Sequence, residues 1–200
     1  MRCFTLIVFL LGACTNPSAA NLQNGDIIFH VSRSAQSLAI QRASNSKYSH
    51  MGLIVYQGKA PFVFEAVKTV RLTPLAQWIA RGEGGHYVVK RLRDAETRLT
   101  PAALKKLRAA ALQYAGRPYD LTFEWSDKRI YCSELVWKAY DQALGIQIGA
   151  LQKLREFKLD DPIVRAKMQE RYGNRIPLQE SVISPAAMFE SALLRVVFEN

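Results

Sequence analysis

The chain has 200 residues, with 27 Lys and Arg against 17 Asp and Glu, and a formal net charge of +10 at pH 7. This length suits one domain after a short leader, and such a domain buries roughly 70% of its unfolded-chain surface. The positive charge favours anionic surfaces such as lipid headgroups or cell-wall polymers. No zinc-finger, helix-turn-helix or RNA-binding signature occurs in the sequence, so we do not expect nucleic acid as a partner.

Residues 1–20 are predicted to be an export signal, because Arg2 precedes an apolar run that is too short to span a bilayer. Two cleavage sites compete. The run Leu11-Gly12-Ala13-Cys14 resembles a bacterial lipobox, in which the cysteine is lipidated. The small residues that end at Ala20 suit an ordinary signal peptidase, which would release a soluble protein. We therefore expect a periplasmic domain over 21–200, anchored to the outer membrane if the cysteine is lipidated.

The pattern of apolar residues after the leader predicts an α+β domain with an antiparallel sheet and covering helices. In chain order, we expect a strand at 27–31, a helix at 34–43, strands at 50–56 and 61–67, a helix at 74–81 and a strand at 86–92. A helix should follow from the Thr100-Pro101 cap to Gly116, and another should begin near Cys132 and run past Ala143. We expect one or two surface helices within 146–181, a short helix after Ser184-Pro185, and a strand at 194–198.

The strands 50–56 and 61–67 are predicted to form a β-hairpin. If the chain turns about Gly58-Lys59, Glu65 lies opposite Gly52 and diagonal to His50 on one face of the sheet. A buried carboxylate in so apolar a strand needs a partner, and the histidine is within reach. A shift of one residue would move these side chains to opposite faces, and the alternative is a glutamate exposed on an edge strand.

Cys132 is the one cysteine in 21–200, so this segment can form no internal disulfide. We expect it in the first turn of a helix, where unpaired N–H groups and the helix dipole stabilise a thiolate. The same groups can stabilise an oxyanion on a substrate. The alternative is a buried cysteine that only fills space. Of the three histidines, His50 is the best placed as a base, since His30 lies near a strand end and His86 near a surface loop.

These residues predict a cysteine nucleophile activated by His50, which Glu65 orients. Tyr119, Trp125 and Tyr131 lie close to the cysteine in the sequence, where they could line a cleft or only pack in the core. No Cys-x-x-Cys pair or nucleotide-binding motif is present, so we expect no metal and no other cofactor.

Five short motifs resemble, in the same order, the YiiX-like branch of the NlpC-type amidase superfamily, which has a circularly permuted papain-like fold. The motifs are Asn24-Gly25-Asp26-Ile27-Ile28-Phe29, Tyr48-Ser49-His50-Met51-Gly52, Val63-Phe64-Glu65-Ala66, Gly116-Arg117-Pro118-Tyr119-Asp120 and Tyr131-Cys132-Ser133-Glu134. The resemblance covers nearly all of 21–200. It implies a cysteine hydrolase with the nucleophile Cys132 at a helix N-terminus, His50 as base and Glu65 as third member.

The resemblance also implies substrate contacts for the residues that flank the nucleophile, Tyr131 and Ser133, and for Tyr119 and Asp120 in the segment that leads to it; we add Trp125 as a cleft residue. Ordinary NlpC-type enzymes carry an Asp-Cys-Ser-Gly run that helps to bind the free amine of a cell-wall peptide, and this run is absent here. We expect cleavage of an amide in a cell-wall peptide or another small amino-acyl or γ-linked substrate. The alternatives are lipid acyl-ester cleavage or acyl transfer, and a non-catalytic binding module. The sequence does not determine the oligomeric state.

Overall fold

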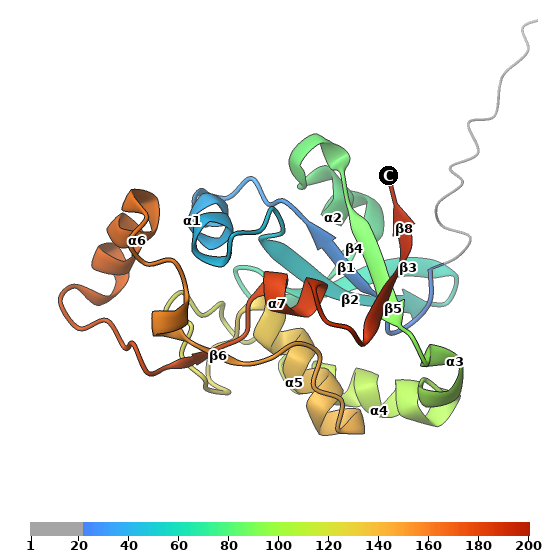
Figure 1. Cartoon of the computed structure of the whole chain (residues 1–200). Coiled ribbons are helices and arrows are strands. Elements are labelled where there is room, and N and C mark those ends of the chain that lie inside the picture. Colours follow the sequence, from blue (N-terminus) through green and yellow to red (C-terminus); the bar gives the residue numbers. More distant parts are fainter. Residues whose placement is uncertain (1–21) are drawn as a thin grey trace, which may run out of the picture.

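The apolar strands expected from the sequence pair into one six-stranded antiparallel sheet in the computed structural model, which describes residues 22–200 (Figure 1). The order of strands across the sheet is β4-β3-β2-β1-β5-β8. Their bounds are β1 Ile27–His30, β2 His50–Gln57, β3 Ala60–Ala66, β4 Val70–Pro74, β5 Val88–Leu92 and β8 Leu194–Glu199. A second sheet contains only β6 Gln152–Lys153 and β7 Ser181–Val182.

The described residues contain seven α-helices, which pack on the main sheet or on one another (Figure 1). They are α1 Ala35–Ser44, α2 Leu75–Ala80, α3 Ala95–Arg98, α4 Pro101–Leu112, α5 Cys132–Leu144, α6 Pro162–Tyr172 and α7 Pro185–Phe189. Two short 3₁₀ turns lie at η2 Glu83–Gly85 and η3 Leu154–Glu156. None of the described helices is long and apolar enough to cross a bilayer.

The alternation of side chains along the strands divides the core into two layers. Phe29, Leu53 and Phe64 belong to the larger layer, which also contains the buried residues of α4 and α5. Ile28 and Val63 point to the opposite face, where α2 covers them. The antiparallel sheet with helices on both faces confirms the predicted α+β fold.

The β2–β3 hairpin has the predicted register. Gln57 pairs with Ala60 and Leu53 with Phe64, so the turn falls at Gly58-Lys59 and Gly52 comes opposite Glu65. The strand period of two therefore places His50 and Glu65 on one face, the face that α2 covers.

Helix α5 is buried over its first nine residues, Cys132 to Tyr140, because it packs against α4, β2, β3 and α7. Its N-terminus is held by the Glu134 carboxylate, which accepts a hydrogen bond of 3.4 Å from the backbone N–H of Tyr131. Gly145 ends the helix in the left-handed conformation, with φ 64°. The predicted start of this helix at the cysteine is confirmed.

The structure corrects several sequence-based expectations. Residues 70–74 form strand β4, which the sequence did not predict because Arg71, Thr73 and Pro74 interrupt its apolar pattern. Helix α2 accordingly begins at Leu75. The segment 146–181, expected to include one or two surface helices, contains α6, and it also contributes β6, the start of β7 and buried apolar residues. The predicted export signal at 1–20 lies outside the described residues.

The turn before β1 is fixed by a buried ion pair. Gly25 has φ +90°, a conformation that favours glycine, and it leads into the fully buried Asp26. The Asp26 carboxylate accepts hydrogen bonds from Arg91 Nε at 2.6 Å and Nη2 at 2.8 Å, and from the backbone N–H of Gln23 at 2.8 Å. These bonds tie the start of β1 to β5, and thereby hold the centre of the sheet.

Candidate active site

Cys132 is the first residue of α5, and its sulfur meets the beginning of β2. The thiol is hydrogen-bonded to His50. It also accepts hydrogen bonds from two backbone N–H groups, that of Met51 in the strand and that of Ser133 in its own helix. The helix N-terminus therefore supplies one donor to the sulfur, and the strand supplies a second donor together with the histidine.

His50 connects the cysteine to a carboxylate. Its Nε2 lies 2.7 Å from Oε2 of Glu65, so Nδ1 is the ring nitrogen that remains for Cys132. Both His50 and Glu65 are buried. The structure thus brings together the three residues that the sequence suggested, although they lie 15 and 67 positions apart along the chain.

Two further residues hold Glu65, and sequence reasoning missed both. Thr73 Oγ1 donates a hydrogen bond of 2.6 Å to Oε1, and Arg81 Nη2 donates to the same oxygen. Thr73 lies on β4 and Arg81 directly follows α2. No local pattern identified them, because β4 itself was not predicted.

These contacts set the charge state of the site. Burial alone would raise the pKa of Glu65, but His50, Thr73 and Arg81 outweigh it and lower this pKa to about 2. Burial would lower the pKa of His50, but the hydrogen bonds and charges of Cys132 and Glu65 raise it to about 9. Burial would raise the pKa of Cys132, yet the hydrogen bond and charge of His50, together with the two backbone N–H groups, lower it. These shifts favour a thiolate on Cys132 and an imidazolium on His50 over the neutral pair.

A second histidine lies beside the first. The His30 ring stacks on Trp78 with centroids 3.9 Å apart, and it lies 5.3 Å from the His50 ring. Burial, followed by the nearby charges of His50 and Arg81, lowers the pKa of His30 to about 3. His30 is therefore neutral and fills the space behind His50, whereas His86 lies next to the C-terminal residue Asn200.

Tyr119 places a hydroxyl next to the nucleophile. Its oxygen accepts a hydrogen bond of 3.3 Å from Gln36 Nε2 and is also hydrogen-bonded to Cys132. Burial and the charge of Cys132 raise the pKa of Tyr119 well above its usual value, so the phenol keeps its proton. A protonated hydroxyl here donates toward a negative charge on the sulfur or on a bound carbonyl oxygen.

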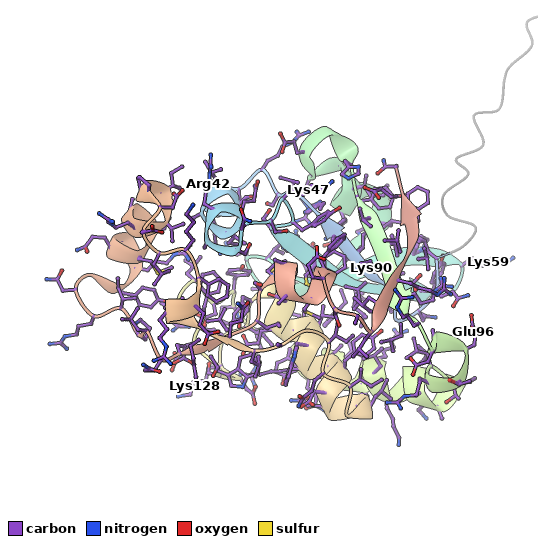
Figure 2. All side chains as sticks on the ribbon, in the orientation of Figure 1. Arg42, Lys47, Lys59, Lys90, Glu96 and Lys128 are labelled. Atoms are coloured by element: carbon purple, nitrogen blue, oxygen red, sulfur yellow. The ribbon has the colours of Figure 1, made fainter. Side chains whose placement is uncertain are left out.

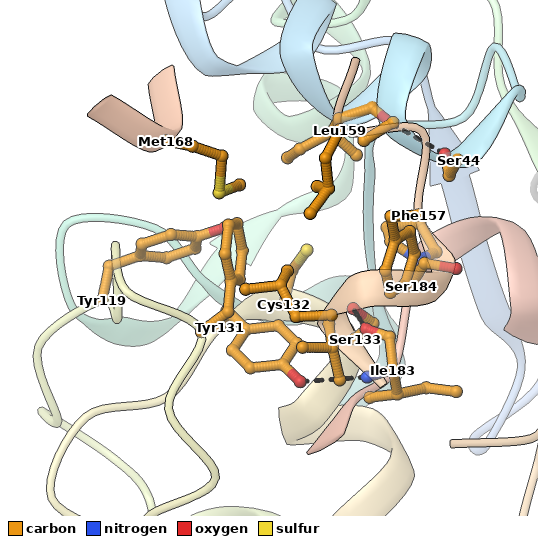
Figure 3. A pocket seen from close by; sticks show the side chains of 16 residues that line it. Ser44, Tyr119, Tyr131, Cys132, Ser133, Phe157, Leu159, Met168, Ile183 and Ser184 are labelled. Atoms are coloured by element: carbon orange, nitrogen blue, oxygen red, sulfur yellow. Dashed lines mark hydrogen bonds between the residues drawn. The ribbon is translucent and has the colours of Figure 1, made fainter. Parts of the chain in front are cut away.

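An apolar cavity of about 60 Å³ begins at Cys132 (Figure 3). Figure 3 shows the sulfur directed toward this cavity, between aromatic residues and the side chains of the 154–168 segment. Its lining is Ile40, Ala43, Ser44, Tyr119, Phe123, Tyr131, Cys132, Ser133, Leu154, Phe157, Leu159, Met168, Val182, Ile183, Ser184 and Pro185. Since a water molecule needs about 10–15 Å³ by this measure, the cavity has room for roughly four to six waters or a short aliphatic chain.

Tyr131 and Ser133 lie in the wall of this cavity, but their polar atoms point into the protein. The Tyr131 hydroxyl accepts a hydrogen bond of 3.1 Å from the backbone N–H of Ile183, and Ser133 Oγ donates one of 2.8 Å to the carbonyl oxygen of Ile183. The two side chains thus hold the segment before α7 against the start of α5. They shape the cavity and do not present a polar group to it.

Asp120 and Trp125 line neither the apolar cavity nor a larger cleft that also borders Tyr119. The buried Asp120 carboxylate accepts bonds from the backbone N–H groups of Thr122 at 2.9 Å and Glu124 at 2.6 Å, so it organises the loop before α5. Trp125 packs edge-on against Trp137, with ring centroids 5.3 Å apart. Both residues therefore support the loop before α5.

Among the described residues, no group of three or more His, Cys, Asp and Glu side chains is arranged to hold a metal ion. This matters because a crystal structure of YiiX from Escherichia coli O157:H7 is described as that of a metalloprotein. That structure superposes with a TM-score of 0.85 at 53% sequence identity, over 89% of this chain and 97% of the other.

Two sequence comparisons agree with this structural likeness. The chain is 54% identical over 175 residues to YiiX of Escherichia coli strain K12, which is described as uncharacterized; the match covers 88% of this chain and 85% of that protein. The family described as "permuted papain-like amidase enzyme, YaeF/YiiX, C92 family" matches residues 21–198. The resemblance inferred from the five motifs is therefore confirmed, and the chain belongs to the YaeF/YiiX (C92) family of permuted papain-like cysteine amidases.

Proposed function

We propose that the chain hydrolyses an amide through a thioester on Cys132, with His50 as acid and base and Glu65 as the residue that orients His50. The observation that carries this proposal is the hydrogen-bonded series Cys132–His50–Glu65 at the N-terminus of α5. Covalent acyl transfer by a thiol needs a nucleophile, a base and a carboxylate that orients the base, and this series supplies the three in that order.

The reaction follows from the charges of the resting site. The Cys132 thiolate attacks the amide carbonyl, and the oxyanion that forms accepts hydrogen bonds from the helix N-terminus and from the Tyr119 hydroxyl. His50 gives its Nδ1 proton to the nitrogen of the leaving amine as the C–N bond breaks. Neutral His50 then takes a proton from water, which attacks the thioester and releases a carboxylic acid, so that the Cys132 thiolate and the protonated His50 are restored.

The apolar cavity supports an aliphatic acyl group as the part that is transferred to Cys132. Its lining offers no charged side chain to a polar γ-glutamyl or diamino-acid group, so it gives no support to a cell-wall peptide. The same cavity favours a second candidate function, cleavage or transfer of an aliphatic acyl ester from a lipid. Both reactions pass through an acyl group on Cys132 and differ in the bond broken and in the acceptor.

The test is a direct search for the acyl-enzyme. The full chain and its Cys132→Ala variant are mixed with N-hexanoyl anilide or with hexanoyl 4-nitrophenyl ester, quenched in acid and digested with trypsin. We expect a hexanoyl group on the peptide 130–138 of the wild type only. Amide turnover with release of hexanoic acid supports the amidase, whereas turnover of the ester alone supports the second candidate. An unmodified peptide with both substrates would contradict a catalytic role and favour a binding module.

We also propose that the protein is exported, on the strength of residues 1–20. The N-terminal peptide of the protein expressed in a bacterium decides between the two cleavage sites. A lipid-modified Cys14, lost in Cys14→Ser, indicates a lipoprotein, and an N-terminus at Asn21 indicates a soluble periplasmic protein. A chain that retains Met1 in the cytosol contradicts export.

A further inference from the structure

A second cleft, of about 790 Å³, shares Tyr119 and Ile40 with the lining of the apolar cavity. Its residues come from the β1–α1 loop, α1, the ends of β2 and β3, and the segment after α2. They are His30, Ser32, Arg33, Ser34, Gln36, Ile40, Ser49, His50, Ala66, Val67, Lys68, Ala80, Arg81, Tyr119 and Leu121. Three of these described lining residues are Arg or Lys, and none is Asp or Glu.

Two of the three cations have no partner in the part of the chain that the structure describes. The side chains of Arg33 and Lys68 are exposed and form no hydrogen bond or ion pair with a described residue. Arg81 differs, because its guanidinium is bonded to Glu65. The charge that remains available to a ligand in the cleft is therefore that of Arg33 and Lys68.

The segments that carry these two cations are held in place. Ser32, next to Arg33, forms a β-bridge with Gly82 and donates its backbone N–H to Ser49 Oγ at 3.0 Å. The carbonyl oxygen of Lys68 accepts a hydrogen bond of 3.1 Å from the backbone N–H of Tyr119. Anchored backbones keep both cations at the rim of the cleft, where uncompensated positive charge attracts anions.

The reacting groups decide which part of a substrate enters the cleft. Cys132 borders the apolar cavity, whereas His50 borders the cleft. If the acyl group occupies the cavity, the leaving amine that His50 protonates extends into the cleft. We propose that this leaving group carries an oxyanion, a carboxylate or a phosphate, which Arg33 and Lys68 bind. The inference rests on the proposed function for the direction of the substrate, and it specifies the substrate as an N-acyl compound with an anionic amine part.

The first experiment measures binding without turnover. The full chain with Cys132→Ala is titrated in a calorimeter with N-hexanoylglycine and with its neutral counterpart N-hexanoylglycinamide. A second pair, N-hexanoylethanolamine phosphate and N-hexanoylethanolamine, tests a phosphate as the anion. We expect at least one anionic ligand to bind about tenfold more tightly than its neutral partner, because charge-assisted hydrogen bonds are worth at least this factor. The pair with the larger ratio identifies the anion.

The second experiment assigns the preference to its residues. In Arg33→Gln/Lys68→Gln, made in the Cys132→Ala background, the preference for the anion should fall to about one while the neutral ligand binds as before. The matched control is Lys59→Gln/Arg175→Gln, which removes the same charge from exposed residues that do not line the cleft and should keep the preference. Figure 2 shows Lys59 on the β2–β3 turn, at the far side of the molecule from α1.

The outcomes separate the two proposals. Equal binding of anionic and neutral ligands, or a preference that survives Arg33→Gln/Lys68→Gln, overturns the anion site. The same four compounds are then given to the wild type with Cys132 intact. If none is hydrolysed although the anion is bound, the proposed reaction fails and the cleft is an anion-binding site without turnover of these amides.

Discussion

His50 Nε2 lies 2.7 Å from Oε2 of the buried Glu65, which leaves the other ring nitrogen for Cys132. The orientation of the imidazole is therefore determined by a carboxylate on the neighbouring strand. Glu65 is in turn fixed by Thr73 and Arg81, so that the hydrogen-bonded series runs through three elements of the fold before it reaches the sulfur.

Replacing Glu65 by glutamine should lower kcat/KM by roughly 10²–10⁴, the usual contribution of general acid–base catalysis. Glutamine preserves the shape of the side chain but removes the Glu65 charge, which together with Cys132 raises the pKa of His50 to about 9. The pKa of Cys132 should rise in consequence. The measurement is hydrolysis of a hexanoyl amide, with Glu170→Gln as control because that glutamate is exposed and pairs with Lys167 on the surface of α6. Equal losses in both variants would contradict the role of Glu65.

The pH dependence of Cys132 should show an activated thiol. Alkylation by iodoacetamide, followed on the tryptic peptide 130–138, should have its midpoint below the ~8.5 of a free thiol. His50→Ala should move the midpoint upward, because the hydrogen bond and charge of the histidine lower the pKa of the thiol. Hydrolysis should fall as the pH rises through about 9, since His50 then loses the proton that the leaving amine needs. A midpoint unaffected by His50→Ala would argue against the thiolate–imidazolium pair.

Gly52→Ala should push apart the two strands of the hairpin, β2 with His50 and β3 with Glu65. A Cβ at this position would lie 2.4 Å from Val63 Cγ1 and 2.9 Å from the backbone oxygen of Phe64. Because backbone must move to relieve the second contact, we expect a loss of about 1–3 kcal/mol in the free energy of unfolding. We also expect lower activity in the fraction that remains folded. Thermal unfolding and kcat/KM test this, and Gly52→Ala/Val63→Ala should recover part of the stability. Unchanged values in the single variant would contradict the register.

Asp26→Asn should lower stability more than catalysis. The substitution removes the negative charge from the buried ion pair between Asp26 and Arg91, and breaking such a pair costs about 3–5 kcal/mol. Urea unfolding measures this loss, with the exposed Asp160→Asn as control. Below the unfolding transition, kcat/KM should stay close to that of the wild type. A stable variant without activity would show that Asp26 acts on the site directly.

Met168→Trp should shorten the apolar cavity from the side of α6. Met168 is buried in its wall, and a larger ring there fills space that the acyl chain would use. We expect hydrolysis of hexanoyl amides to fall by about tenfold, which corresponds to about 1.4 kcal/mol, while acetyl amides react as before. Ile163→Trp, on the exposed side of the same helix, is the control. Equal loss for acetyl and hexanoyl amides would indicate that the chain does not enter this cavity.

The sequence alone predicted much of the chemistry, because that part depends on local rules. The strand period of two and a two-residue turn were sufficient to place His50 diagonal to Glu65. The apolar stripe that follows Cys132 indicated that the cysteine begins a helix. The order of the motifs correctly identified the family.

Only the tertiary structure decided which elements that are distant along the chain contact one another. Thr73, Arg81, His30 and Trp78 meet around the triad because β4, α2 and β1 pack together. The apolar cavity forms where residues of α1, the 154–168 segment and the turn before α7 converge on Cys132. In the same packing, Trp125 contacts Trp137 and the Asp120 carboxylate binds the backbone of its own loop, although both residues are near the cysteine in the sequence. The physical reason is that periodicity determines which face of an element is apolar, whereas long-range packing determines which faces come together.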